Sequence, residues 1–285
     1  MIIDFHTHVF PPQIKKNRNK YIDSDPCFAI LYSEKDAKLA TADELIASMD
    51  KAGVNISVVL NIGWTTHELC VETNDYILES IARYPNRLIG FCSVQPQSYE
   101  AALDEIERCA KEGIRGVGEI RPDIQLFDPR DEEVMAPFIN AIRKHKLMLL
   151  SHASEPIGHI YPGKGAVTPE VLYPFIDRYP ELTIILAHWG GGLPFYALMP
   201  EVSGVMKNVF FDTAASPLLY SPQIYEQVIQ LVGAEQILFG SDYPTLEQGQ
   251  ALKDIASPNL SEETKNLILA GNAQKLLGIT SKTTR

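Results

Sequence analysis

Short hydrophobic runs alternate along this chain with segments whose apolar residues recur at helical spacing. The runs are continuous rather than interrupted by polar residues, as is typical of strands that are covered on both faces. We expect eight strands, at Ile2–His8, Val54–Leu60, Arg87–Val94, Ile114–Ile120, Leu147–Leu150, Leu182–Ala187, Val209–Asp212 and Gln236–Phe239.

Helices are predicted between these strands. The clearest begins at Thr41, which forms a capping box with Glu44, and ends at Gly53. Further helices are expected over His67–Tyr84, Ala101–Lys111, Glu132–His145, Thr168–Tyr179, Ser221–Val232 and Ser261–Leu277. Eight strands alternating with helices in a chain of 285 residues predict one (β/α)8 TIM barrel over residues 1–285, in the α/β class. A doubly wound open sheet is the alternative.

The stretch over residues 9–40 breaks this pattern. It contains Pro11-Pro12, several basic residues between Lys15 and Lys20, and Asp25-Pro26. A long irregular segment within a compact chain is often functional. We therefore expect an irregular lid insertion over the carboxyl end of the first strand, and a surface excursion without a role is the alternative.

The composition narrows the classes of function. The chain carries a formal net charge of −11 and has no basic run, which argues against binding to nucleic acid or to anionic membranes. A small anionic substrate remains compatible, because a metal ion or an arginine can dominate the local field. No hydrophobic run approaches the roughly 18 residues of a membrane span. The four cysteines lack C-x-x-C spacing and are expected to be buried, reduced thiols of a cytoplasmic protein.

Two histidines, His6 and His8, close the first predicted strand. Alternate side chains of a strand point the same way, so the two imidazoles share a face. Side by side in a buried place they repel each other when charged and lack partners when neutral, and a shared metal ion removes both problems. The pair therefore indicates a metal site. The alternative is a turn-capping histidine beside a surface histidine.

Four more side chains of the types that bind metals lie at or just beyond the ends of other predicted strands, and they are Glu119, His152, His188 and Asp242. In a (β/α)8 barrel the carboxyl ends of all strands meet at one rim. Imidazole and carboxylate ligands without a thiolate suit zinc, manganese or iron. We expect a divalent metal, with zinc as the first choice and manganese or iron as alternatives.

Two kinds of metal centre fit these residues. A mononuclear centre would combine the histidine pair with His152 and Asp242 and leave one position for water. A binuclear centre would add Glu119 as a bridge, with His152 and His188 on the second ion. In either centre the metal lowers the pKa of its water, and Asp242 accepts and transfers a proton. His188 is either a second ligand or a catalytic group that stabilises developing charge.

Arg121 and Trp189 are candidates for contact with the substrate. Arg121 follows Glu119 closely and would either hold a substrate carboxylate by a bidentate contact or neutralise Glu119. Trp189 directly follows His188, so it would either line the pocket or pack in the core.

Four motifs together resemble the amidohydrolase superfamily, and they are Asp4-Phe-His-Thr-His8, Ala187-His-Trp-Gly-Gly-Gly-Leu-Pro194, Phe239-Gly-Ser-Asp-Tyr-Pro244 and Gly271-Asn-Ala-Gln-Lys-Leu-Leu-Gly278. The branch they are most similar to is the amidohydrolase-2 group, which includes aminocarboxymuconate-semialdehyde decarboxylase. The resemblance implies a metal-dependent TIM barrel with His6, His8, His152 and Asp242 as ligands. It also implies that His188 is a ligand or a catalytic residue.

The sequence Gly116-Val-Gly-Glu-Ile120 departs from the decarboxylases of that group. Its Glu119 is similar to the metal-bridging glutamate of TatD-like hydrolases. We therefore expect a hydrolase that uses a metal-activated water, with one or two ions, on an amide, lactone or ester-like bond of a small molecule. A metal-dependent decarboxylase of a small carboxylated substrate is the alternative. Family members often form homodimers, which the resemblance implies here as well.

Overall fold

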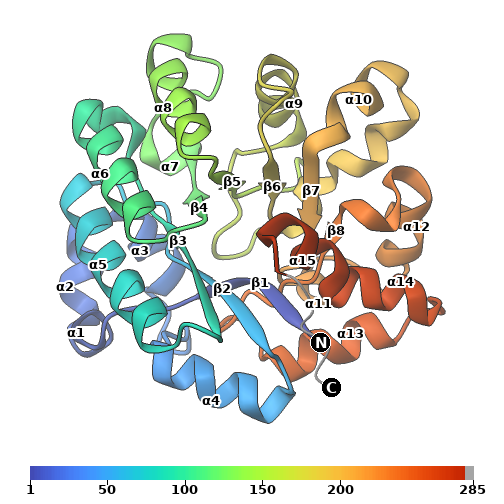
Figure 1. Cartoon of the computed structure of the whole chain (residues 1–285), viewed down its shortest axis with the longest axis horizontal. Helices are drawn as coiled ribbons and strands as arrows, with labels where there is room; N and C mark the ends of the chain where they lie inside the picture. Colours follow the sequence, from blue (N-terminus) through green and yellow to red (C-terminus); the bar gives the residue numbers. More distant parts are fainter. Residues whose placement is uncertain (280–285) are drawn as a thin grey trace.

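Eight parallel strands form a ring in sequence order, with helices around it (Figure 1). The computed structural model describes residues 1–279. The strands are β1 (Ile3–His8), β2 (Ile56–Leu60), β3 (Leu88–Cys92), β4 (Gly116–Ile120), β5 (Met148–Ser151), β6 (Ile184–Leu186), β7 (Val209–Asp212) and β8 (Ile237–Leu238). Each lies within or next to a predicted strand, and the predicted (β/α)8 barrel is confirmed.

Backbone hydrogen bonds between β1 and the end of β8 close the ring. The Phe5 N–H donates to the Phe239 carbonyl at 2.7 Å, and the Asp242 N–H donates to the His6 carbonyl at 2.9 Å. The second bond places Asp242 beside the histidine pair of β1. Barrel closure and the position of this carboxylate therefore depend on the same backbone contact.

Most helices lie where helical spacing predicts them, and these are α4 (Ala42–Ala52), α5 (His67–Arg83), α6 (Glu100–Lys111), α8 (Glu132–Lys144), α9 (Pro169–Arg178), α12 (Gln223–Val232), α14 (Glu262–Asn266) and α15 (Asn272–Leu277). The capping box between Thr41 and Glu44 is present. Beyond residue 40, the helices that were not predicted are α7 (Pro122–Gln125), α10 (Pro200–Val205), α11 (Ser216–Leu219) and α13 (Gln248–Ala256). Three of these four span six residues or fewer, which is too short for apolar periodicity to reveal.

The prediction of an irregular segment over residues 9–40 is wrong. The segment forms α1 (Pro12–Lys16), α2 (Arg18–Ser24) and α3 (Pro26–Tyr32). Asp25 caps α3 by accepting from the Phe28 N–H at 2.9 Å and also accepts from the Thr65 N–H at 2.8 Å. The Phe28 ring stacks on Trp64 at 5.4 Å. These contacts attach the three helices to the residues that follow β2, and a lid function for the segment stays a prediction.

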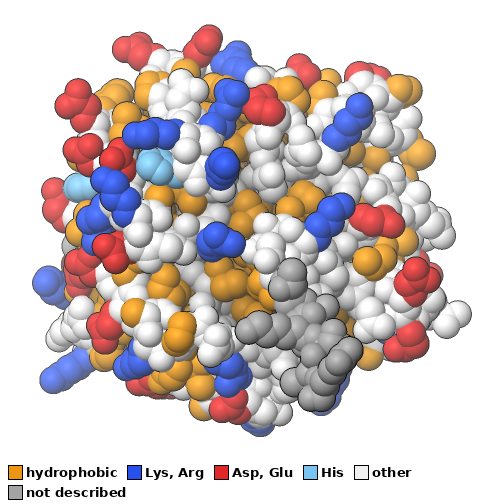
Figure 2. Space-filling view, viewed as in Figure 1, with side chains coloured by type: hydrophobic (Ala, Val, Ile, Leu, Met, Phe, Trp, Pro, Cys, Tyr) orange, Lys and Arg blue, Asp and Glu red, His pale blue; other side chains and the backbone are white. Residues whose placement is uncertain are grey.

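The amino-terminal end of the barrel is closed by α15, where Ala273 and Leu277 pack on Ile3 and Phe5. A cavity of about 650 Å³ lies at this end and is lined in part by residues that precede β4, β5 and β6. On the face shown in Figure 2, Lys and Arg side chains lie among Asp and Glu side chains. Among residues 1–279, no helix has the length and apolar character needed to cross a membrane.

A buried polar network joins α5, β3 and α6. Asn74 of α5 donates through Nδ2 to the Ser93 carbonyl at 2.8 Å and to Glu105 Oε1 at 2.7 Å. Arg108 donates to both carboxylate oxygens of Glu105. Burial opposes ionisation of Glu105, but the hydrogen bonds from Arg108 and Asn74 outweigh it and hold its pKa below the usual value.

Replacing Glu105 by Gln is expected to lower the free energy of unfolding by about 1–3 kcal/mol at pH 7, because a buried charged hydrogen bond is lost. The ionised carboxylate stabilises the fold above the pKa of an unfolded Glu, about 4.3, and this stabilisation is lost as the pH falls further. Urea unfolding of both proteins at pH 7 and pH 3.5 measures the effect, with the exposed Glu112→Gln as control. A difference that does not shrink at the lower pH would contradict the network's role.

Candidate metal centre

Two strands that carry candidate ligands each contain one extra residue relative to a neighbouring strand. In β1, Asp4 pairs with Ser57 and Thr7 with Val59, so three steps in β1 match two in β2. In β4 the register with β5 shifts in the same way between Val117 and Ile120. A bulge of this kind redirects the side chains beside it. The bulges therefore allow His6 and Glu119 to face the carboxyl-end interior of the barrel.

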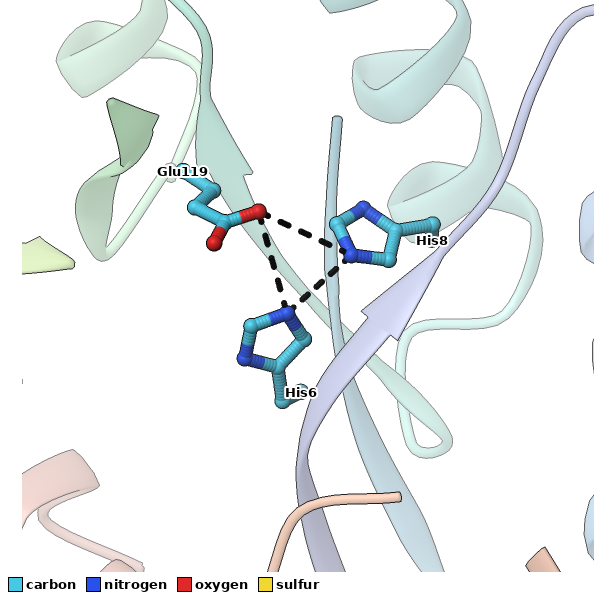
Figure 3. Close-up of side chains that lie close together, drawn as sticks. All are labelled: His6, His8 and Glu119. Carbon is cyan, nitrogen blue, oxygen red and sulfur yellow. Dashed lines mark hydrogen bonds and ion pairs between the residues drawn. The ribbon is translucent and has the colours of Figure 1, made fainter. Parts of the chain in front are cut away.

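The first group of side chains consists of His6, His8, Glu119 and Asp242. The Nε2 atoms of His6 and His8 lie 3.0 Å apart, and Glu119 Oε2 lies 4.0 Å and 3.8 Å from them (Figure 3). Asp242 Oδ1 lies 3.2 Å from His8 Nε2 and 3.7 Å from His6 Nε2. Two imidazole nitrogens and two carboxylate oxygens thus converge on one small region.

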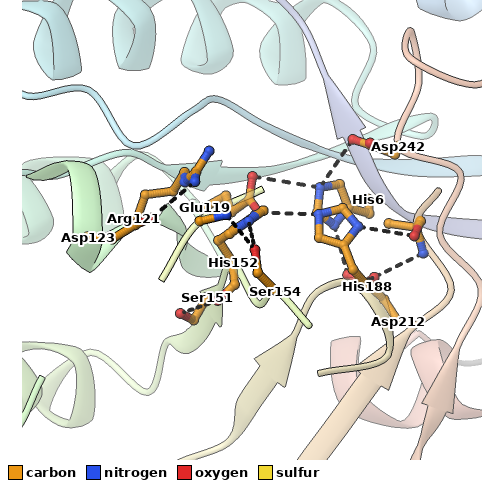
Figure 4. A network of polar contacts seen from close by, with 12 residues as sticks. His6, Glu119, Arg121, Asp123, Ser151, His152, Ser154, His188, Asp212 and Asp242 are labelled. Atoms are coloured by element: carbon orange, nitrogen blue, oxygen red, sulfur yellow. Dashed lines mark hydrogen bonds and ion pairs between the residues drawn. The ribbon is translucent and has the colours of Figure 1, made fainter. Parts of the chain in front are cut away.

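The second group shares Glu119 with the first. His152 Nδ1 lies 2.8 Å and His188 Nε2 lies 3.8 Å from the other carboxylate oxygen, Oε1 (Figure 4). His152 Nε2 lies 3.0 Å from the Ser154 hydroxyl oxygen. The six side chains named as ligands or catalytic groups from the sequence therefore lie together, with Glu119 between two pairs of histidines. Their roles as ligands stay predictions.

Asp212, which the sequence reasoning did not identify, orients two of these histidines. It ends β7, is fully buried, and accepts from His6 Nδ1 at 2.8 Å and from the His188 N–H at 3.0 Å. The ring of His188 is held by the Ala214 carbonyl, 3.1 Å from Nδ1. Because a carbonyl only accepts, His188 Nδ1 carries the proton and its Nε2 faces the centre. The position of Asp212 at the end of a predicted strand was the signal that could have revealed it.

Asp4, from the first motif, joins β1 to the segment after β8. Its carboxylate accepts from the Ser241 N–H at 2.9 Å, the Ser241 hydroxyl at 2.6 Å and Gln248 Nε2 at 2.8 Å. Burial raises its pKa to about 6 despite these hydrogen bonds. Asp4 does not face the ligand groups, so its contribution is to hold Ser241, and with it the adjacent Asp242, against β1.

The charges of the centre are strongly coupled. Burial disfavours a protonated His6, but the Asp212, Glu119 and Asp242 carboxylates outweigh it and raise its pKa to about 10. Burial would also raise the pKa of Glu119, but the surrounding histidines hold it well below the usual value. By contrast, burial and the Arg121 guanidinium lower the pKa of His152 to about 4. The carboxylates of this enclosed region thus favour a positive charge at its centre.

The donor set fits a divalent metal ion. The groups His6–His8–Glu119 and Glu119–His152–His188 each place three ligand atoms within 4.8 Å of one another. Within the described residues His8 Nδ1 has no hydrogen-bond partner, while its Nε2 faces the other ligand atoms. Nitrogen and oxygen donors of this kind bind zinc, manganese and iron.

The two candidates for substrate contact lie in different surroundings. The Trp189 indole is buried, donates from Nε1 to the Ser216 hydroxyl at 3.0 Å and meets the Tyr225 ring at 5.0 Å. Core packing accounts for this position, and substrate contact by Trp189 stays a prediction. Arg121 follows β4 and forms an ion pair with Asp123 at 3.3 Å. Within residues 1–279 Arg121 forms no ion pair with Glu119, so direct neutralisation of Glu119 by Arg121 is not seen.

The chain matches a known protein family and resembles known proteins over most of its length. The model of the Amidohydrolase family matches residues 3–279. The chain is 24% identical to the 2-amino-3-carboxymuconate-6-semialdehyde decarboxylase of Dictyostelium discoideum, over 97% of this chain and 91% of that protein. It is 26% identical to the gamma-resorcylate decarboxylase of a Polaromonas species, over 82% and 86%.

A solved structure shares the fold. The 5-carboxyvanillate decarboxylase of Novosphingobium aromaticivorans, crystallised with manganese and 4-hydroxy-3-methoxy-5-nitrobenzoic acid, superposes with a TM-score of 0.81. The two chains are 21% identical, and the match covers 98% of this chain and 96% of the other.

These comparisons correct the prediction of a hydrolase, which is wrong: the relatives that match over most of the chain are decarboxylases, the alternative reading. The error came from Glu119, whose similarity to the metal-bridging glutamate of TatD-like hydrolases favoured hydrolysis. The same ligand types serve both kinds of chemistry, so the residue did not discriminate between them. Zinc as the metal, a homodimer and a cytoplasmic location stay predictions.

Replacing Asp212 by Asn is expected to weaken binding of manganese by about 10–100-fold, because the outer partner that orients His6 is lost. Titration with manganese, followed by competition with a chelating dye, measures the dissociation constant. Asp254→Asn, which alters a buried carboxylate that accepts from Tyr225 elsewhere in the barrel, is the matched control. Equal affinities in the wild type and Asp212→Asn would contradict this role.

Proposed function

The chain belongs to the Amidohydrolase family, and on that premise we propose that it is a metal-dependent decarboxylase of a small carboxylated acid. The observation that carries the proposal is the nature of the relatives: proteins that match over 97% and 82% of this chain are decarboxylases. The histidine and carboxylate groups at the carboxyl end of the barrel support it, since this is where TIM-barrel enzymes hold their substrates.

In this proposal His6, His8, Glu119 and Asp242 hold a divalent ion, and His188 is left free to carry a proton. Manganese is the metal we favour, because the structurally similar 5-carboxyvanillate decarboxylase was crystallised with it. When bound, such an ion withdraws electron density from the substrate oxygens that it contacts.

The protein must also supply a proton. Loss of carbon dioxide breaks a carbon–carbon bond and leaves the electron pair on the carbon atom, where a C–H bond replaces it. His188 is placed to hold this proton, because Ala214 fixes its Nδ1 and only Nε2 faces the centre. Asp242 is the second group at the centre that can transfer a proton. His6 and Glu119 are 0% and 5% exposed, so the centre has little contact with bulk water.

Manganese-loaded protein is expected to release carbon dioxide from at least one of 5-carboxyvanillate, gamma-resorcylate and 2-amino-3-carboxymuconate-6-semialdehyde, the acids that the relatives act on by name. His188→Asn is expected to slow this release by about a hundredfold or more, the usual contribution of a general acid. Carbon dioxide release and bound metal are measured on the same samples, so that a lost proton donor is distinguished from a lost ligand.

His145→Asn is the matched control, because this histidine follows α8 at the opposite end of the barrel. It is expected to retain the wild-type rate. Fully metal-loaded wild type that releases no carbon dioxide from any of the three acids would contradict the proposed function.

A further inference from the structure

Arg121 is buried with most of its hydrogen-bonding capacity unused. The residue is 1% exposed, and its one ion pair within residues 1–279 joins Nη2 to Asp123 Oδ2 at 3.3 Å. Its Nε and Nη1 atoms have no hydrogen-bond partner in the described chain. Because Nη2 carries two hydrogens and uses one for Asp123, a complete pair of parallel N–H donors remains.

The guanidinium lies beside the candidate metal centre. Arg121 follows Glu119 by two residues, and Figure 4 draws both side chains in one network of polar contacts. A methyl group on Gly165 would lie 2.5 Å from Arg121 Nη2, and the Gly165 N–H donates to the Ser154 hydroxyl at 2.9 Å. That hydroxyl also lies 3.0 Å from His152 Nε2. Gly165 and Ser154 therefore connect the guanidinium to the His152 imidazole by successive contacts.

Buried donors on a charged group need acceptors, since burying them unpaired is costly. Trp64 is a neighbouring case: its Nε1 is also buried without a partner among residues 1–279. Gln125 connects the two residues, because it accepts from the Arg121 N–H at 2.8 Å and donates to the Trp64 carbonyl at 2.9 Å. Asp123 Oδ1 is a buried acceptor beside Arg121 that also has no partner among residues 1–279. The unpaired N–H donors of Arg121 and Trp64 outnumber this one oxygen, and a substrate carboxylate would supply the further acceptors.

We propose that Arg121 binds a second carboxylate of the substrate, one that is retained in the product, so that the enzyme acts on small dicarboxylated acids. The inference rests on the proposed function and names its substrate class. Of the acids that the relatives act on by name, 5-carboxyvanillate carries two carboxylates and gamma-resorcylate carries one. The unpaired donors of Arg121 favour an acid with two carboxylates.

The retained carboxylate is the better partner for chemical reasons. A carboxylate that departs as carbon dioxide loses its charge, so a bidentate arginine contact would stabilise it in the substrate and oppose the reaction. A carboxylate that stays keeps its charge throughout, and a contact with it binds the substrate and the transition state equally. Loss of Arg121 is therefore expected to raise KM with little change in kcat.

Access to Arg121 requires movement of the chain that covers it. The segment between β5 and α9, which contains Gly165, has neither helix nor strand over residues 152–168. Asp123 holds this segment in place by accepting from the Ala166 N–H at 3.0 Å. Displacement of Gly165 from the guanidinium would open the N–H groups to the substrate.

The test compares two inert probes that differ by one carboxylate, isophthalate and benzoate. Calorimetric titration of manganese-loaded wild type is expected to show isophthalate binding about tenfold tighter or more, as a charged bidentate contact provides. Arg121→Met is expected to bind both probes within about threefold of each other, and Arg121→Lys, which keeps the charge but not the paired donors, to be intermediate. Arg115→Met removes the same charge at the other end of β4 and is expected to behave as the wild type.

The outcomes separate this inference from the proposed function. A wild-type preference for isophthalate that Arg121→Met abolishes supports the carboxylate site, even if no acid yields carbon dioxide and the proposed function fails. Equal binding of both probes by the wild type, binding of neither, or a preference that persists in both Arg121 variants would overturn it. Melting temperatures of the variants check their folding, and Arg121→Lys decides the matter if Arg121→Met does not fold.

Discussion

A single buried carboxylate, that of Glu119, connects the two halves of the site. One of its oxygens faces the His6–His8 pair and the other faces His152 and His188. Four imidazoles can surround one carboxylate in a buried region only if the charges balance, and the low pKa of Glu119 reflects that dependence. The candidate metal centre is therefore one coupled unit, and the strands that meet in it are held to a common geometry.

The rest of the barrel maintains this geometry from outside. The bulge in β1 allows Phe5 to pack in the interior while the histidines beyond it face the centre. Asp212 orients the His6 ring, and Asp4 holds Ser241 and therefore the chain that carries Asp242. Each of these partners is buried and acts through a residue of the centre. Stability and function are thus connected at the carboxyl end of the strands. At the opposite end α15 packs by its apolar side chains, and Asn272 Nδ2 donates to the Ala234 and Ile237 carbonyls.

Hydrophobic periodicity was enough to predict the eight strands, because buried parallel strands are continuous apolar runs. It also placed six polar residues at strand ends. It did not reveal the helices between Pro12 and Tyr32, whose apolar residues pack as a small separate cluster around Trp64. The bulges and the contact between Asp212 and His6 arise from pairing of distant segments, which no local pattern records. The type of reaction was not predictable from Glu119, since its chemistry suits both hydrolysis and decarboxylation.

We propose that His6, His8 and Glu119 form a metal site. Anomalous diffraction from crystals grown with manganese tests it most directly, because it locates the ion without reference to activity. We expect a peak within bonding distance of His6 Nε2, His8 Nε2 and a Glu119 oxygen, and a second peak beyond Glu119 if the centre is binuclear. The absence of any peak there, or a peak only at another place in the barrel, would contradict a metal site at these residues.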